Sequence, residues 1–374
     1  MSGSNLLRIP EWILEDLETL ERLHPFTPIL ARFAKKYRRL IDSRIWGEEH
    51  QENLLRRTLR ALLNSDPRFT ATYNPLALLG FFEQTQHHGR DHYFHSFTNF
   101  LLGCLVIDRC AGVFDRFRAT CFPSAAGWST EYVWLLTVFF HDVGYPVQKY
   151  EQIHEMVFGV SPTDGERLVA QRREAWDSPT YRVARSQMVS LYEHLAQGEI
   201  LSDWRADPFP LAAHPLDRAF ERSFLRSGHG VASGMRMLAD LFRHIPESPP
   251  HRQFLVPHIF LAALSIPFHD WPVRECLRDE GISAISTGRF PFAGLLAFLD
   301  SIQEDRRERG QGPDILTRLS VRGTVVEAHM NLEQLPAEKL PAKRREVAEI
   351  KSFLVEDALQ FQYPEGLAPI PSAR

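Results

Sequence analysis

The chain has 374 residues, of which 43 are Lys or Arg and 47 are Asp or Glu, so its formal net charge is −4. The apolar fraction of 44% and the charged fraction of 24% are ordinary for a globular protein with a sizeable core. This balance excludes a strongly basic protein and does not indicate a nucleic-acid duplex as the partner, although an average can hide a local basic groove. The length allows two domains, or one large domain with additions.

The cysteines and the apolar segments give a first view of the cellular setting. Cys104, Cys110, Cys121 and Cys276 form no Cys-x-x-Cys pair, so neither a zinc knuckle nor a thioredoxin-like motif is indicated. We expect them to be reduced, partly buried thiols. The N-terminal stretch MSGSNLLRIPEWILEDL does not resemble a signal peptide, and the longest apolar runs are about half a membrane span. The sequence therefore predicts a soluble, cytoplasmic protein with no membrane partner.

Most of the chain has the 3.6-residue periodicity of helices. In IPEWILEDLETLERL, the residues Ile13, Leu14, Leu17 and Leu20 form one apolar stripe, and Pro10 suits the first turn. Strand-like alternation is scarce before residue 315. Further helices are expected at 27–45, 50–64, 76–86, 91–114 and 129–142.

The segment 147–222 differs from its surroundings because it is rich in charged and aromatic residues. We interpret it as an inserted helical segment, either a lid or a dimer surface, and the alternative is further helical packing. Its arginines would form a patch that faces phosphate or nucleic acid, or else a solvated helical face. These arginines are Arg167, Arg172, Arg173, Arg182 and Arg185.

The C-terminal third begins with three more expected helices, at 229–244, 253–268 and 291–307. After RERGQGPD the pattern changes. LSVRGTVVEAHMNL is typical of a strand or hairpin, AEKLPAKRREVAEIKSFL of a helix that Pro341 starts or interrupts, and VEDALQFQY of a returning strand. We therefore predict a mainly α fold with a small C-terminal α/β appendage.

Four histidines and two aspartates stand out by their position in or at the ends of apolar segments, where an isolated imidazole is costly. Taken singly, each histidine is more often a hydrogen-bonded core residue than a ligand. The alternative role for Asp300 is an ion pair with Arg306 or Arg307, one to two helical turns further on. The role that we consider for His258 is to support a ligand rather than to bind the metal itself. The set consists of His95, His141, Asp142, His229, His269 and Asp300.

Taken together, these side chains have the composition of a metal site. Imidazole and carboxylate suit a divalent transition metal, and one carboxylate can bridge two ions. Two ions about 3.5–4 Å apart can hold a phosphoryl oxygen and activate water for in-line displacement. Packed helices supply the rigid support that such a site needs.

The order of these residues resembles the HD-domain metal-dependent phosphohydrolase superfamily. His95 in HSFTNFLLG is similar to the first histidine of that family, and His141-Asp142 in FFHDVGYP to its doublet, with Gly144 in the usual place. Asp300 in LLAFLDSIQEDRR is similar to the closing aspartate. The remaining two histidines, His229 and His269, fit the positions that two-metal branches add. The resemblance covers roughly 85–310, interrupted by the insertion.

The resemblance implies a division of the ligands between two metals. His95, His141, Asp142 and Asp300 would hold one ion, and Asp142 would bridge to a second ion bound by the other two histidines. A bridging hydroxide would be the nucleophile. The implied cofactors are two divalent metal ions, and Mn, Fe, Mg, Ni and Zn are not distinguished. The implied organisation is an N-terminal helical extension at 1–75, an HD-domain helical core at 76–312 with the insertion, and the appendage at 313–374.

One departure from the family concerns the substrate. Related phosphodiesterases often carry lysine soon after the doublet, where this chain has Tyr145 followed by Pro146, and Lys149 is a candidate replacement one turn further on. Arg90 and Arg306 are candidates for phosphate contact, with solvated surface arginines as the alternative. The predicted catalytic residues are Asp142, Lys149 and Arg90, and the predicted substrate-binding residues are Arg90, Tyr145, Lys149 and Arg306.

The predicted function is hydrolysis of a phosphomonoester or phosphodiester, with a nucleotide as the expected small-molecule partner. Two alternatives stay open, namely an HD-fold di-iron oxygenase and a nucleotide-binding signalling module without turnover. The long interval between Asp142 and His229 favours a substrate pocket roofed by structure particular to this chain. The sequence does not decide whether the protein is a homo-oligomer.

Overall fold

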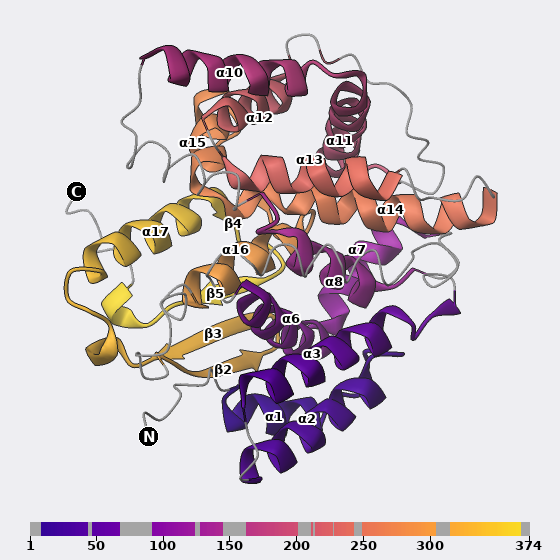
Figure 1. Cartoon of the computed structure of the whole chain (residues 1–374), viewed down its shortest axis with the longest axis vertical. Helices are drawn as coiled ribbons and strands as arrows, with labels where there is room; N and C mark the ends of the chain where they lie inside the picture. The colour runs from indigo at the N-terminus through magenta and orange to yellow at the C-terminus, as the bar shows by residue number, and fades with distance from the viewer. Residues whose placement is uncertain are drawn as a thin grey trace. The chain divides into compact units, whose positions relative to one another are not determined.

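The structure is a computed structural model and is mainly helical, with short strands towards the C-terminus (Figure 1). It describes residues 9–43, 47–67, 92–123, 128–144, 162–200, 211, 214–226, 228–242, 249–303 and 315–367. The prediction of a mainly α fold with a small C-terminal α/β region is confirmed. The expected helix at 76–86 lies outside the described residues.

The helices and strands have the following bounds. The α-helices are α1 (Glu11–Leu17), α2 (Thr27–Asp42), α3 (Glu48–Leu63), α6 (His92–Arg109), α7 (Ala111–Cys121), α8 (Thr130–Phe140), α10 (Pro162–Trp176), α11 (Pro179–Gln197), α12 (Pro215–Leu225), α13 (His229–Phe242), α14 (Pro249–Ser265), α15 (Trp271–Asp279), α16 (Pro291–Gln303) and α17 (Leu340–Phe353). The short 3₁₀ helices are η1 (Pro267–His269), η3 (Leu332–Gln334) and η4 (Glu365–Leu367). The strands are β1 (Ile285–Ser286), β2 (Leu316–Arg322), β3 (Val325–Met330), β4 (Leu354–Val355) and β5 (Gln360–Gln362).

The chain divides into two compact units. The first consists of Met1–Phe114, Phe298–Glu349 and Leu359–Arg374, and the second of Asp115–Ala297 and Ile350–Ala358. Three helices, α7, α16 and α17, therefore contribute residues to both units. The domain boundaries expected at 75/76 and 312/313 stay a prediction.

The first unit combines helices with a three-stranded sheet. Helix α1 packs against α2 and α6, and α2 packs against α3. The stripe predicted from the sequence is buried in this packing, from Ile13 and Leu14 to Leu20. Each such side chain contributes about 1.5–3 kcal/mol when fully buried.

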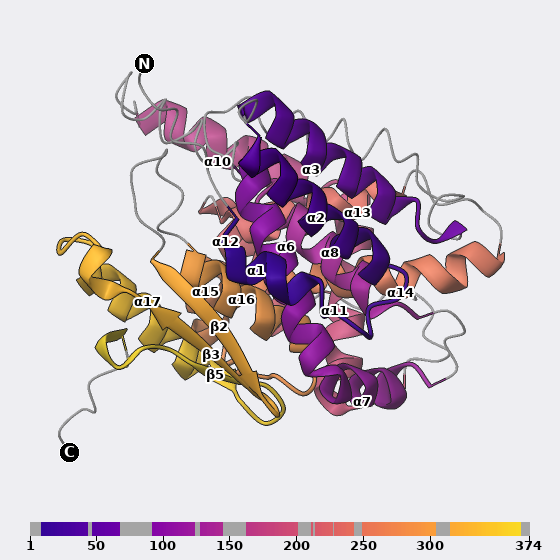
Figure 2. The same ribbon diagram turned by 90° about the horizontal axis from the view of Figure 1, so that it is seen from below.

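The sheet of the first unit has the strand order β2-β3-β5, visible as neighbouring arrows in Figure 2. Strands β2 and β3 are antiparallel and joined at Gly323, whose φ of 64° favours glycine. Strand β5 adds in parallel to β3, with Val326 opposite Phe361. The predicted hairpin is thus confirmed. Pro341 lies in the first turn of α17, so it starts that helix rather than interrupting it.

The second unit is built around α8, whose residues from Glu131 to Phe140 are all buried. The helix packs on α14, which also contacts α11 and α13. Helix α12 packs on α15, and β1 pairs in parallel with β4. The C-terminal α/β region therefore supplies strands to both units.

The helices of the insertion belong to the packing of the second unit. Helix α11 contacts α13 and α14, and α12 contacts α13 and α15. Arg185 is buried, donates to both carboxylate oxygens of Asp217 and lies over the Trp176 ring at 4.2 Å. The interpretation of these helices as further helical packing is therefore favoured. Because Arg185 is buried, the predictions that it belongs to a solvated helical face or to a patch facing phosphate or nucleic acid are both wrong.

The prediction of one continuous helix at 91–114 is also wrong, because the helix is interrupted at Cys110, between α6 and α7. Apolar periodicity continues on both sides of the break, so the pattern does not reveal the bend. In the described part of the chain, no single helix combines the length and apolarity of a membrane span. Two consecutive helical segments meet these criteria when they are taken together, namely Phe94–Arg109 and Ala111–Cys121. They are bent by 81° relative to each other, and the match rests on length and composition alone.

The four cysteines are free, and they are buried rather than partly buried as expected from the sequence. Burial raises the pKa of Cys110 to about 11, and it raises the pKa of Cys121 to about 11 as well. Thiols of this kind are poor nucleophiles near neutral pH, because the thiolate is the reactive form.

Candidate metal centre

Three side chains of the second unit bring their ligand atoms together, from three different elements. Asp142 follows α8, His229 is the first residue of α13, and His269 is the last residue of η1. Their ligand atoms all lie within 4.8 Å of one another. The Nε2 atoms of the two histidines are 3.0 Å apart, and His229 Nε2 lies 3.6 Å from Asp142 Oδ1.

Local sequence explains where α8 begins. Ser129 caps its N-terminus by accepting from the backbone N–H of Tyr132, and its hydroxyl donates to Glu131 at 2.6 Å. The acidic side chain in the first turn also suits the positive end of the helix dipole. The ring of His258 supports this cap, since its Nε2 accepts from Ser129 N at 2.9 Å. His258 therefore orders the start of the helix whose far end carries the doublet.

The end of α8 is held close to the first turn of α13. Gly144 N donates to the Ser233 hydroxyl at 2.7 Å. A Cβ atom at Gly144 would lie 2.5 Å from the carbonyl oxygen of His229. The glycine is thus required by close approach of two backbones, and this approach brings Asp142 to His229.

Two of the histidines are oriented by the carbonyl group three residues earlier. His141 Nδ1 lies 2.6 Å from Val138 O, and His269 Nδ1 lies 2.5 Å from Ile266 O. A carbonyl oxygen only accepts, so Nδ1 carries the proton in both rings. Each ring then directs a deprotonated Nε2 away from its own turn, as a metal ligand requires.

The spacing of the two Nε2 atoms fits a shared cation. An ion about 2.1 Å from each nitrogen, with an angle of about 90–110° at the ion, leaves them about 3.0–3.4 Å apart. The observed 3.0 Å lies in this range. Two imidazoles and a carboxylate suit Zn, Mn, Fe or Ni better than Ca. The residues present therefore fit a divalent metal.

Asp142 faces a second histidine through its other oxygen. Its Oδ2 lies 3.4 Å from His141 Nε2, while its Oδ1 is the atom nearer to His229. Both His141 and Asp142 are buried. One carboxylate thus directs one oxygen to each of two imidazoles, within the second unit.

The remaining two predicted ligands meet in the first unit. His95 on α6 and Asp300 on α16 are 205 residues apart in the chain, and His95 Nε2 lies 2.9 Å from Asp300 Oδ1. Asn99 Nδ2 lies 3.1 Å from the same nitrogen. An imidazole nitrogen and a carboxylate oxygen this close share a proton or a cation. The assignment of these two residues to one metal with His141 and Asp142 stays a prediction.

The predicted substrate contacts cannot be placed in the same way. Arg90, Tyr145, Lys149 and Arg306 all lie outside the described residues. Sequence reasoning also missed Asp270, which is buried beside His229. The signal was present, because His269-Asp270 repeats the dipeptide of the first doublet.

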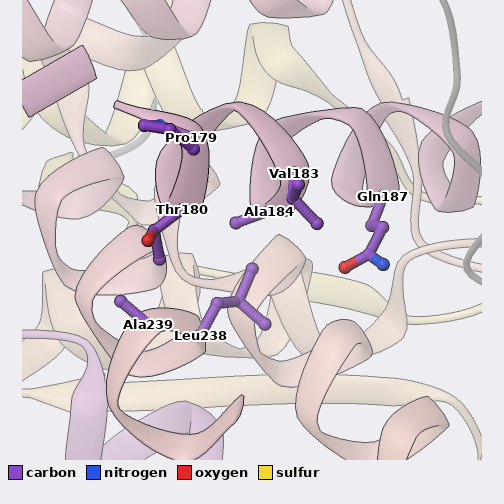
Figure 3. Close-up of a pocket in the computed structure, with 7 residues that line it drawn as sticks. All are labelled: Pro179, Thr180, Val183, Ala184, Gln187, Leu238 and Ala239. Carbon is purple, nitrogen blue, oxygen red and sulfur yellow. The ribbon is translucent and has the colours of Figure 1, made fainter. Parts of the chain in front are cut away.

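A separate pocket of about 320 Å³ lies between α11 and α13, as Figure 3 shows. The described residues that line it are largely apolar, and none of them is titratable. The lining residues are Pro179, Thr180, Val183, Ala184, Gln187, Leu238 and Ala239.

Fold and site together define a mainly helical protein with buried histidine–aspartate groups that can bind metal ions. Comparison of the chain with protein-family models, with curated proteins and with solved structures found no match.

Proposed function

We propose that the chain is a metal-dependent phosphohydrolase that acts on a nucleotide or a related phosphate ester. The observation that carries the proposal is the convergence of the Asp142 carboxylate with the Nε2 atoms of His229 and His269. The order of the histidines and aspartates in the sequence supports it independently, because it resembles a family of such enzymes.

When bound, a divalent cation would supply Lewis acidity and lower the pKa of a water molecule towards neutrality. The side chains of this protein have the task of holding it. Asp142 has one oxygen near His141 and the other near His229, which supports a bridging role between two positions. A monodentate ligand to a single ion would need only one of these contacts.

Backbone carbonyl groups orient two of the candidate ligand histidines. The rings of His141 and His269 are held by carbonyl groups of their own turns, so little reorganisation is needed. Helix α8 is buried from Glu131 to Phe140, which lowers the local dielectric and would strengthen the attraction between the ligands and a bound cation. Such preorganised electrostatics are commonly the largest contribution to catalysis of this type.

The test begins with metal analysis of the purified protein, followed by a hydrolysis screen. The screen would include nucleoside phosphates, cyclic nucleotides and a nitrophenyl phosphodiester. We expect bound transition metal and hydrolysis of at least one of these compounds. Asp142→Asn and His229→Ala should each lose metal and activity, because each removes a ligand from the cluster.

A matched control is His214→Asn. His214 is a half-buried histidine of the same unit, where it caps α12 and bonds Glu193 outside the cluster. Asparagine is also a good N-cap, so this variant should keep its metal and its activity.

The outcomes separate the alternatives. Iron content with oxygen uptake and no hydrolysis would favour an oxygenase. Tight nucleotide binding that never turns over would favour a binding module. Unchanged metal content in both ligand variants would contradict the proposed centre altogether.

A further inference from the structure

Asp270 makes two contacts that connect it with His229. The side chain lies between η1 and α15 and is 4% exposed. Its Oδ2 accepts from the backbone N–H of Gly230 at 3.0 Å, and its Oδ1 lies 3.4 Å from His229 Nδ1. One carboxylate thus faces both the ring of His229 and the backbone of the next residue.

The position of His229 in its helix explains why a carboxylate is needed. His141 follows the last turn of α8 and His269 ends η1, so a carbonyl three residues earlier can hold each ring. His229 is the first residue of α13, and no turn of that helix precedes it. The group that lies near its Nδ1 is instead the Asp270 carboxylate, at 3.4 Å, from the junction of η1 and α15.

The approach of Asp270 is built into the backbone on both sides. A Cβ atom at Gly230 would lie 2.8 Å from Asp270 Cβ, so only glycine allows this separation. The buried Arg274 donates to the carbonyl oxygens of Phe268 at 3.1 Å and His269 at 2.5 Å. The backbone of the segment that carries His269 and Asp270 is therefore held by the buried side chain of Arg274 on α15.

We propose that Asp270 is a positioning residue that keeps the proton of His229 on Nδ1 and directs Nε2 to the ion. The inference rests on the proposed function for the presence of that ion. With Nδ1 protonated in both His229 and His269, two Nε2 lone pairs face each other at 3.0 Å. A cation shared by the two nitrogens would stabilise this geometry. Carboxylates behind ligating imidazoles have this effect in metalloproteins.

The discriminating variant is Asp270→Asn. Both neighbours of the carboxylate are donors, namely Gly230 N–H and His229 Nδ1–H, and an ionised carboxylate can accept from both. An amide has one acceptor oxygen and one donor group. Asparagine can therefore satisfy Gly230 only by presenting N–H₂ to His229, which favours the wrong tautomer.

The experiment is a titration of the metal-free full-length protein with Co²⁺, followed by visible absorption, together with melting of the metal-free protein. Asp270→Asn should weaken Co²⁺ affinity about 10–100-fold and change the absorption band. Its metal-free melting temperature should stay close to that of the native protein. Asp279→Asn is the control, because it makes the same charge change at the far end of α15, where Asp279 pairs with Arg222. It should keep native affinity.

Native Co²⁺ affinity in Asp270→Asn would overturn the inference and leave the proposed function intact. Weakened affinity together with a large fall in the metal-free melting temperature would also overturn it, because it would indicate a structural role. Failure of the native protein to bind Co²⁺ would remove the proposed metal centre and the inference together. Native binding without any hydrolysis would count against the proposed reaction alone.

Discussion

Gly144→Ala tests whether close approach of α8 and α13 forms the candidate metal centre. The added methyl group would lie 2.5 Å from His229 O, 2.9 Å from Ala232 Cβ and 3.0 Å from Ser233 N. Two of these atoms belong to the backbone, so no side chain can rotate away to make room. Gly144 is not among the glycines with positive φ, so the substitution perturbs contact rather than conformation.

The magnitude follows from these distances. Non-bonded heavy atoms are most favourable at about 3.5–4.0 Å, so the two segments must separate by roughly 1 Å to bring the 2.5 Å contact to the lower end of that range. Overpacking of this kind costs about 1–3 kcal/mol. Separation would also lengthen the 2.7 Å bond from Gly144 N to Ser233 Oγ, which adds about 1 kcal/mol. We therefore expect a loss of about 2–4 kcal/mol.

The assay is urea unfolding of the metal-free protein, with a parallel measurement of metal affinity. Affinity should also fall, because Asp142 moves away from His229 with the shifted backbone. Gly112→Ala is the matched control, since a Cβ atom there meets nothing within 4 Å and the residue is helical. It should be neutral or stabilise by about 0.5–1 kcal/mol.

Equal unfolding of Gly144→Ala and the native protein would refute the reasoning. Such a result would mean that the two helices are not held as closely as the 2.5 Å separation requires. Reduced stability with unchanged metal affinity would support the close packing at Gly144. It would contradict the claim that this packing sets the position of the metal ligands.

Three further predictions concern single contacts. Ser233→Ala leaves the buried Gly144 N–H without its acceptor and should cost about 1–3 kcal/mol in urea unfolding, and an unchanged midpoint would contradict this role. Burial opposes ionisation of Asp357, but hydrogen bonds from Ser286 and the Gly288 backbone outweigh it and lower the pKa of the carboxyl. The resulting stability is present above the unfolded pKa of about 4 and is lost as pH falls through the folded value, so Asp357→Asn should flatten the pH dependence of unfolding below pH about 4. Burial raises the pKa of Cys110 to about 11, so we expect its thiol to react with iodoacetamide at pH 8 far more slowly in the native than in the unfolded protein. Mass spectrometry measures the alkylation, and rapid alkylation of the native protein would show that the thiol is accessible.

Local features of the fold could be predicted because they depend on neighbouring residues. The hairpin β2–β3 follows from alternating residues around Gly323, and α17 has Pro341 in its first turn, where proline is tolerated. The candidate ligands were also identifiable, since a histidine or aspartate at the end of an apolar run is unusual. The sequence could therefore name the residues of the candidate centre but not their distances.

Contacts between distant segments could not be predicted. The helix expected at 253–268 ends at Ser265, and His269 lies on the separate turn η1, where Ile266 O can hold its ring. The break at Cys110 is equally invisible in the periodicity. Arg185 looked like a solvated arginine because its partner Asp217 is 32 residues away.

The chain by itself determined which side chains are available for metal binding and on which local elements they lie. The tertiary structure decided that Gly144 meets Ser233, 89 residues later, and that Asp270 lies near His229 from the junction of η1 and α15. The physical reason is the distance along the chain over which each effect acts. Periodicity and capping act over a few residues, whereas ligand geometry depends on how closely two backbones approach, which is set by the packing of whole helices.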